Sequence, residues 1–154
     1  MQFIALLPIV FAAAANAITV TRDTTYDDGS YSLYNTACSD GPNGLVTATR
    51  TMLNQFPSYP YVGGSQYVED WNSNQCGSCY QLSYNGNSIY LVAVDSADDG
   101  FTTSSYAYNQ LVTGQTGDYS NYDNYDSYGN YGNYDNYGEI DAEVTQVDAH
   151  HCGL

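Results

Sequence analysis

Four cysteines, Cys38, Cys76, Cys79 and Cys152, constrain this chain more than any other feature of its sequence. An even number of cysteines in a chain with a secretory start predicts two disulfide bonds, and the sequence alone allows three pairings. A bond between distant cysteines removes freedom from the unfolded chain, so each long closure stabilises the fold by roughly 4 kcal/mol. We therefore expect a small, cross-linked, extracellular domain.

The secretory start is the segment MQFIALLPIVFAAAANA. Residues 3–15 are apolar except for Pro8, and Ala15-Asn16-Ala17 fits the small-x-small cleavage pattern of a signal peptide. The apolar run is shorter than the roughly 20 residues that span a bilayer. We expect residues 1–17 to be a signal peptide, residues 18–154 to form one domain, and the protein to be secreted without membrane insertion.

Two other uses of the cysteines are possible. The CGSC motif, residues 76–79, has the spacing of a redox site, but such a site precedes a helix, and here a strand pattern follows. Alternatively, Cys76 and Cys79 together with His150 and His151 have a spacing compatible with a tetrahedral zinc site. An oxidising compartment favours disulfides over both. We expect no metal and no cofactor.

The charge balance excludes several classes of partner. Arg22 and Arg50 are the only strong cations, against 17 acidic residues in a chain of formal net charge −15. Nucleic acids and anionic membranes require clustered Lys and Arg, so neither is an expected partner. A neutral polysaccharide suits the chain better, because Tyr and Trp side chains stack on sugar rings.

The pattern of elements predicts a small β-barrel with helical insertions. Residues 79–96 predict two strands joined by a turn at Asn85-Gly86, and the LVAV run within them should be central and buried. The other predicted elements are a strand and turn within 18–35, a short helix within 47–56, an extended piece at 59–64, a helical turn at 66–71, a helix within 102–114 and a strand over 139–149.

A tyrosine-rich tract, residues 118–138, lies between the last predicted helix and the last predicted strand. Seven tyrosines occur at every third position and are separated almost entirely by Asn, Asp, Gly and Ser. The tract has no aliphatic residue with which to build a core, so it is low-complexity sequence for which we expect a disordered surface insert.

The motifs occur in an order that resembles the cerato-platanins, small secreted fungal proteins. They are YDDGSYSLYNTACSDGPNGL, FPSYPYVGG, WNSNQCGSCYQLSYNG, SIYLVAVDSADDGF, LVTGQ and the terminal CGL. The resemblance covers residues 26–115 and 139–154. It implies a six-stranded double-psi β-barrel, mainly β with short helices, and the disulfide pairs Cys38–Cys76 and Cys79–Cys152.

The resemblance also implies a function. Members of this family bind N-acetylglucosamine oligomers of the chitin type in a shallow groove, elicit plant defence, and in some cases loosen cellulose without detectable hydrolysis. Asp95 matches a groove aspartate that is important for loosening. The chain departs from the family where His-Ala-Ala usually follows this aspartate. Here residues 96–99 are Ser-Ala-Asp-Asp, so the groove is more negative.

Three classes of function remain open: a carbohydrate binder and elicitor, a surface-active or wall-structural protein acting through the tyrosine-rich tract, and a glycan-cleaving enzyme. An enzyme would need two carboxyl groups, with Asp40, Asp98 or Asp99 as the partner of Asp95. The His-Phe-Asp signature of expansins is missing, so we expect no catalysis. The expected partners are chitin oligomers, cellulose and a host receptor, and the protein is expected to be a monomer.

The candidate ligand-binding residues are few and mostly polar. Asp95 and Asp40 would accept hydrogen bonds from the sugar, Asn43 could donate and accept, and Tyr61 or Tyr26 could offer a stacking face. Asp40 and Asn43 are equally compatible with a purely structural role in a turn. Trp71, the only tryptophan, is expected in the core.

Overall fold

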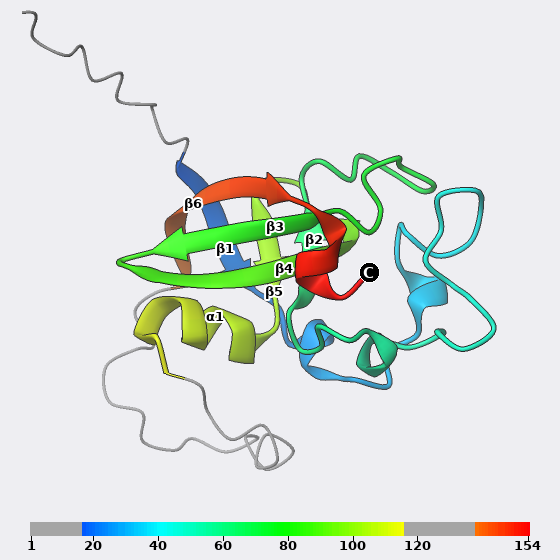
Figure 1. The fold of residues 1–154 in the computed structure, drawn as a ribbon, viewed down its shortest axis with the longest axis horizontal. Helices are drawn as coiled ribbons and strands as arrows, with labels where there is room; N and C mark the ends of the chain where they lie inside the picture. Colours follow the sequence, from blue (N-terminus) through cyan, green and yellow to red (C-terminus); the bar gives the residue numbers. More distant parts are fainter. Residues whose placement is uncertain (1–16, 116–137) are drawn as a thin grey trace, which may run out of the picture.

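Six strands form a closed barrel in the order β1-β5-β2-β4-β3-β6 (Figure 1). The structure, a computed structural model, describes residues 17–115 and 138–154. The strands are β1 (Ala17–Arg22), β2 (Val62–Ser65), β3 (Cys79–Tyr84), β4 (Asn87–Ser96), β5 (Phe101–Thr103) and β6 (Glu139–Val147). The expected six-stranded barrel is confirmed.

The β3–β4 hairpin is the longest local pairing of the barrel, running from Cys79↔Val92 to Tyr84↔Asn87. Its two turn residues, Asn85 and Gly86, both have positive φ angles, of 46° and 84°. This conformation suits the Asn-Gly pair, and it matches the right-handed twist of the flanking strands. The predicted hairpin is confirmed.

Parallel pairs close the barrel between segments distant in the sequence. β1 pairs in parallel with β5, and β2 pairs in parallel with β4, with a register shift between Gly63 and Gly64. A Cβ atom at Gly63 would lie 2.0 Å from the carbonyl oxygen of Thr102. Glycine is therefore required at position 63, where β2 pairs with β5.

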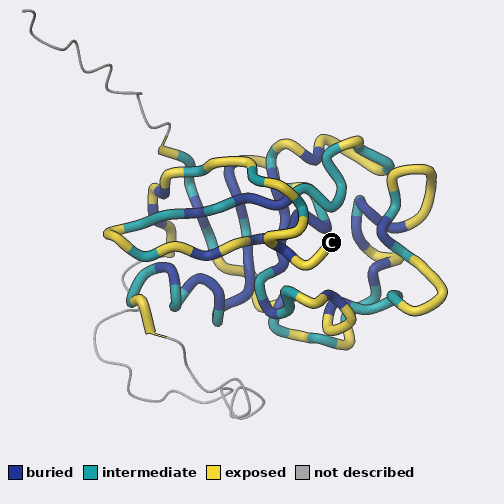
Figure 2. The backbone as a smooth tube through the Cα atoms, viewed as in Figure 1, coloured by how far each residue is buried: buried dark blue, intermediate teal, exposed yellow. Residues whose placement is uncertain are grey.

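The core lies inside the barrel and under the loops beside it (Figure 2). The LVAV run of β4, residues 91–94, is fully buried as predicted. Tyr80 and Phe101 pack edge to face inside the barrel, with ring centroids 4.9 Å apart. Such aromatic pairs stabilise a core beyond the area that they bury.

The helix α1 (Ser105–Thr113) lies against the outside of the barrel and confirms the prediction for residues 102–114 (Figure 1). The Ser104 hydroxyl caps it by accepting from the Ala107 amide at 3.1 Å, and Gly114 ends it at φ 71°. Asp27 tethers its first turn, because its carboxylate accepts from the Ser105 amide at 2.7 Å and from the Ser105 hydroxyl at 2.8 Å.

The segments 23–61 and 66–78 form loops at one end of the barrel, toward the right of Figure 1. They contain the 3-10 turns η1 (Thr24–Asp27), η2 (Leu33–Asn35) and η3 (Leu53–Gln55). The helix predicted within 47–56 is wrong. Met52 forms a β-bridge with Ser32, which holds the chain extended and leaves only η3 as a helical turn. Residues 66–71 form a turn and extended chain, so the helical turn predicted there is also wrong.

Two disulfides fix the loops and the C-terminal end of the chain. Cys38–Cys76 and Cys79–Cys152 have S–S distances of 2.05 and 2.02 Å, so the pairing implied by the resemblance is confirmed. Cys152 belongs to the last 3-10 turn, η5 (Ala149–Cys152). These bonds fit an oxidising, extracellular location.

Two sequence predictions lie outside the described residues: the signal peptide, except for Ala17, and the tyrosine-rich tract, except for Gly138. Within residues 17–115 and 138–154, no helix is long and apolar enough to cross a membrane.

Candidate functional site

Asp95 lies near the end of β4, directly after the buried LVAV run, and is partly buried. One of its carboxylate oxygens accepts hydrogen bonds from the backbone amides of Ala37 at 2.8 Å and Ser96 at 2.9 Å. The bond to Ala37 crosses from the barrel to the loop that follows η2. Asp95 therefore anchors this loop while the rest of its carboxylate stays at the edge of the barrel.

Tyr26, in η1, lies close enough to Asp95 for the carboxylate charge to act on its hydroxyl. The Tyr26 side chain is only 4% exposed. Burial, followed by the negative charges of Asp95 and Asp23, raises the pKa of Tyr26 well above its ordinary value. The hydroxyl therefore stays neutral. The stacking face expected at Tyr26 is wrong, because its ring is buried.

Asp40 and Asn43 lie in the loop after Cys38 and hold a second loop in place. The Trp71 indole N–H donates to the Asp40 carboxylate at 2.9 Å. The Asn43 backbone amide donates to the Asn72 side chain at 2.8 Å, and the Asn43 side-chain amide donates to the Asn72 carbonyl at 3.0 Å. Their observed contacts are thus within the protein, and direct contact with a ligand stays a prediction.

Trp71 is 55% exposed, so its expected place in the core is wrong. The loop that carries it lies outside the barrel between β2 and β3, where the neighbouring residues Glu69, Asp70 and Asn72 are polar. That polar surrounding is the sequence signal that indicates exposure. The indole is held on one edge by Asp40, and Gly41, at φ 95°, lies so close that a Cβ there would be 3.0 Å from the ring.

Ala37 connects the surroundings of Asp95 with those of Trp71. Its amide donates to Asp95, and its carbonyl accepts from the Asn72 amide at 3.2 Å. The Cys38–Cys76 disulfide ties together the same two loops. We call this surface, formed by Asp95, Ala37, Asp40, Trp71 and Asn72, the Asp95–Trp71 face.

Tyr61 contacts α1 instead of Asp95. Its hydroxyl donates to the Gln110 side-chain oxygen, and its ring meets that of Tyr106 edge to face, with centroids 5.9 Å apart. Burial, followed by the charge of Tyr106, raises the pKa of Tyr61 to about 12. Tyr61 is partly buried and belongs to a different surface from the other candidates.

The arrangement suits hydrogen bonding better than acid–base catalysis. The Asp95 carboxylate is engaged by backbone amides, which favours its use as a fixed acceptor. A glycosidase needs a second carboxyl group whose pKa is raised so that it donates a proton. Burial raises the pKa of Asp27, but both of its oxygens accept from Ser105 at the start of α1. Asp27 is therefore a helix anchor.

The two other uses of the cysteines, a redox site and a zinc site, are also wrong. Cys76 and Cys79 are bonded to Cys38 and Cys152, so they form no bond with each other and supply no thiolate to zinc. Among the residues that the structure describes, no group of three or more His, Cys, Asp or Glu could hold a metal ion.

Known proteins resemble this chain in both sequence and fold. The sequence model of the cerato-platanin family matches residues 18–128. The heat-stable 19 kDa antigen of Coccidioides immitis (strain RS) is 40% identical over 101 residues, which are 66% of this chain and 69% of that protein.

Two solved structures resemble the barrel. Cerato-platanin 3 from M. perniciosa has a TM-score of 0.73 at 33% identity, covering 90% of this chain and 100% of that chain. The solution structure of the fungal elicitor Cerato-Platanin has a TM-score of 0.68 at 31% identity, covering 88% and 96%. A family match over more than half of the sequence, with the same barrel, shows that this chain belongs to the cerato-platanin family.

Proposed function

We propose that this protein is a secreted, non-catalytic carbohydrate-binding protein that binds N-acetylglucosamine oligomers of the chitin type at the Asp95–Trp71 face. The observation that carries the proposal is the exposed Trp71 ring, whose N–H is bonded to Asp40. An aromatic ring held in a fixed orientation binds a sugar ring without the entropy cost of ordering a mobile side chain.

The polar groups of the face complement that ring. Asp95 would accept from sugar hydroxyl or acetamido N–H groups, while Asp40 and Asn72 keep the Trp71 loop in place. The chain carries a formal charge of −15, so a neutral glycan is a better ligand than an anionic one. Because Asp95 is a fixed acceptor, the sugar is bound and released without cleavage of a glycosidic bond.

An elicitor role is part of the proposal. A similar structure is described as that of a fungal elicitor, and this chain shares its barrel. Recognition by a host receptor, and loosening of wall polysaccharides without hydrolysis, would follow from binding to glycans at the same face.

Isothermal titration with the N-acetylglucosamine tetramer tests the proposal. Trp71→Ala should raise the dissociation constant at least about tenfold, equivalent to about 1.4 kcal/mol. Trp71→Phe keeps an aromatic face and should raise the dissociation constant by a smaller factor. Tyr34→Ala removes a ring that is 60% exposed on η2, and it serves as the matched control with unchanged affinity.

Two results would contradict the proposal. Equal affinity of the wild type and Trp71→Ala for the tetramer would remove Trp71 from the site. If the wild type releases reducing sugar and Asp95→Asn does not, the protein is an enzyme and the proposal of a non-catalytic binding protein is wrong.

A further inference from the structure

A groove of about 490 Å³ lies between η5, the first half of β4, the segment 57–61 and α1. Its size is within the range of small-molecule sites in proteins. The residues that matter for its chemistry are Tyr61, Ser88, Tyr90, Gln110, His150 and His151. Among the described residues that line it, none is Asp, Glu, Lys or Arg, although the chain carries 17 acidic residues.

Three aromatic rings follow one another at one side of this groove, the first two stacked and the third tilted by 33°. Tyr90 and His151 are parallel within 16°, with centroids 4.9 Å apart, and His151 in turn lies 4.1 Å from His150. Tyr90 remains 38% exposed. His151 covers part of the Tyr90 ring, so the aromatic surface that solvent reaches is the part of Tyr90 that His151 leaves uncovered.

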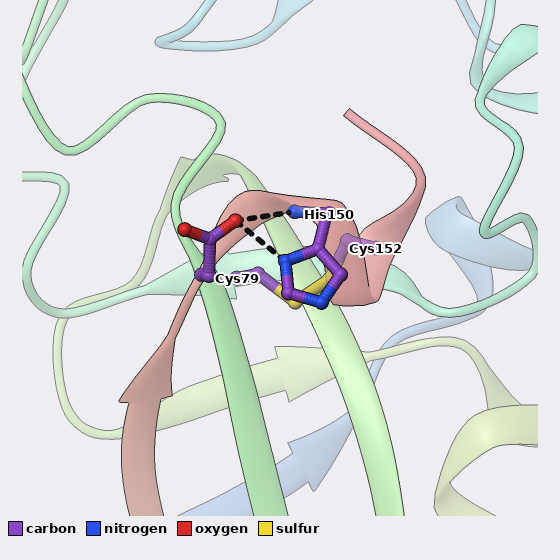
Figure 3. Close-up of polar contacts among 4 residues, drawn as sticks. Cys79, His150 and Cys152 are labelled. Atoms are coloured by element: carbon purple, nitrogen blue, oxygen red, sulfur yellow. Dashed lines mark hydrogen bonds and ion pairs between the residues drawn. A yellow bond between two sulfur atoms is a disulfide. The ribbon is translucent and has the colours of Figure 1, made fainter.

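The stack is held in place from outside the groove. The Asp148 carboxylate accepts from the His150 backbone amide at 3.0 Å and lies 2.7 Å from the ring nitrogen Nδ1 of His150 (Figure 3). The Cys79–Cys152 disulfide bonds η5 to β3. The rings are thus preorganised, which lowers the entropy cost of binding a ligand against them.

Polar groups face the same groove. Gln110 accepts from the Tyr61 hydroxyl, so its amide group is fixed at the α1 side. Ser88 contributes a hydroxyl from β4, which forms a hydrogen bond of 2.7 Å with the hydroxyl of Ser83. The groove thus combines an aromatic surface with oriented hydrogen-bonding groups.

This combination selects one class of ligand. An anion would need Lys or Arg, and a cation would need carboxylates, but the described lining supplies neither. A fully apolar ligand would cover the Gln110 side-chain N–H groups without supplying an acceptor, which is costly. A neutral pyranose ring has an apolar face for the exposed part of Tyr90 and a hydroxyl edge for the polar groups.

We propose that this groove is a second carbohydrate-binding site, in which a sugar ring packs on the exposed part of Tyr90 and forms hydrogen bonds with Gln110 and Ser88. The site is separate from the Asp95–Trp71 face. Tyr90 and Asp95 are five residues apart on β4, which corresponds to roughly 17 Å along a strand. The proposal does not rest on sugar binding at the Asp95–Trp71 face.

The test is a titration of the isotope-labelled protein, followed through its backbone amide resonances. The probes are the N-acetylglucosamine tetramer and cellotetraose. At least one should produce saturating shifts at residues 88–90 and 150–153, in the wild type and in Trp71→Ala alike. Tyr90→Ala should raise the dissociation constant measured at these amides at least tenfold, whereas Tyr90→Phe and the control Tyr34→Ala should leave it unchanged.

Three outcomes would overturn the proposal. The first is that neither sugar shifts these amides, and the second is that Tyr90→Ala binds as the wild type does. The third is that phenol shifts the groove amides while both sugars leave them unchanged, which would identify a site for aromatic compounds. Shifts confined to the surroundings of Trp71 would support the proposed function and refute this second site, so the two proposals fail separately.

Discussion

Replacing Asp95 should change stability in a way that depends on the substituent. Asp95→Ala removes the acceptor of the Ala37 amide, a part-buried hydrogen bond of 2.8 Å. A hydrogen bond to a charged group contributes about 1.5–3 kcal/mol, so the free energy of unfolding should fall by about 2 kcal/mol. At the exposed Ser96 amide, water can replace the Asp95 oxygen, so losing this hydrogen bond adds little to the destabilisation.

Asp95→Asn keeps a side-chain oxygen that can accept from the Ala37 amide. Charge-assisted bonds become neutral ones of roughly half the strength, so this variant should lose only about 1 kcal/mol. Urea unfolding at equilibrium, with disulfides intact, gives the free energy of unfolding by linear extrapolation. Asp98→Ala, at an exposed acid three residues further on, is the control and should stay within about 0.5 kcal/mol of the wild type.

Equal free energies of unfolding for Asp95→Ala and the wild type would refute the anchoring role of this carboxylate. For the same reason, Asp95→Asn is the better variant for binding experiments. A loss of sugar affinity in Asp95→Ala mixes the ligand contact with a disturbed loop, whereas Asp95→Asn isolates the ligand contact.

Three further predictions follow from the cross-links, a buried phenol and the tyrosine-rich tract. Changing both Cys79 and Cys152 to Ser removes a disulfide that links residues 73 positions apart, so the free energy of unfolding measured in urea should fall by about 4 kcal/mol. A fall of less than about 1 kcal/mol would contradict this. Tyr61 should titrate with a pKa of about 12 when its ring carbon resonance is followed by NMR. Its contribution to stability is therefore complete below pH 10 and is lost as the pH rises toward 12. A midpoint at pH 10 would be inconsistent with its partial burial. Replacing residues 117–138 by a short Gly-Asn turn should leave the melting temperature and tetramer affinity nearly constant but lower retention on insoluble chitin; full retention would show that the tyrosines are not a binding element.

Local chemistry made much of the fold predictable. The Asn85-Gly86 turn, the capped helix α1 and the alternating strand β6 all carry their signals within a few residues. The helix expected within 47–56 does not form, because its helical pattern is weak and Met52 forms a β-bridge with Ser32, which is distant in the sequence. The parallel pairing of β1 with β5 joins residues about 80 positions apart, and spacing alone does not reveal such pairs.

The candidate site was predictable in part. The place of Asp95 after a buried strand followed from the sequence, but its hydrogen bond to Ala37 depends on the fold that brings these two distant segments together. Trp71 is exposed although tryptophan is usually buried, and its polar neighbours are the only local signal of that exposure. Tyr61 contacts α1, and nothing in the sequence near it indicates that contact.

Fluorescence of Trp71 tests the central claim most directly, because the chain has one tryptophan and its emission reports on the Asp95–Trp71 face alone. Addition of the N-acetylglucosamine tetramer should shift the emission to shorter wavelength and slow its quenching by acrylamide, because a stacked sugar covers the exposed ring. Both changes should saturate at the same concentration as the heat of binding. Binding heat that saturates while the emission and the quenching stay unchanged would contradict sugar binding at this face.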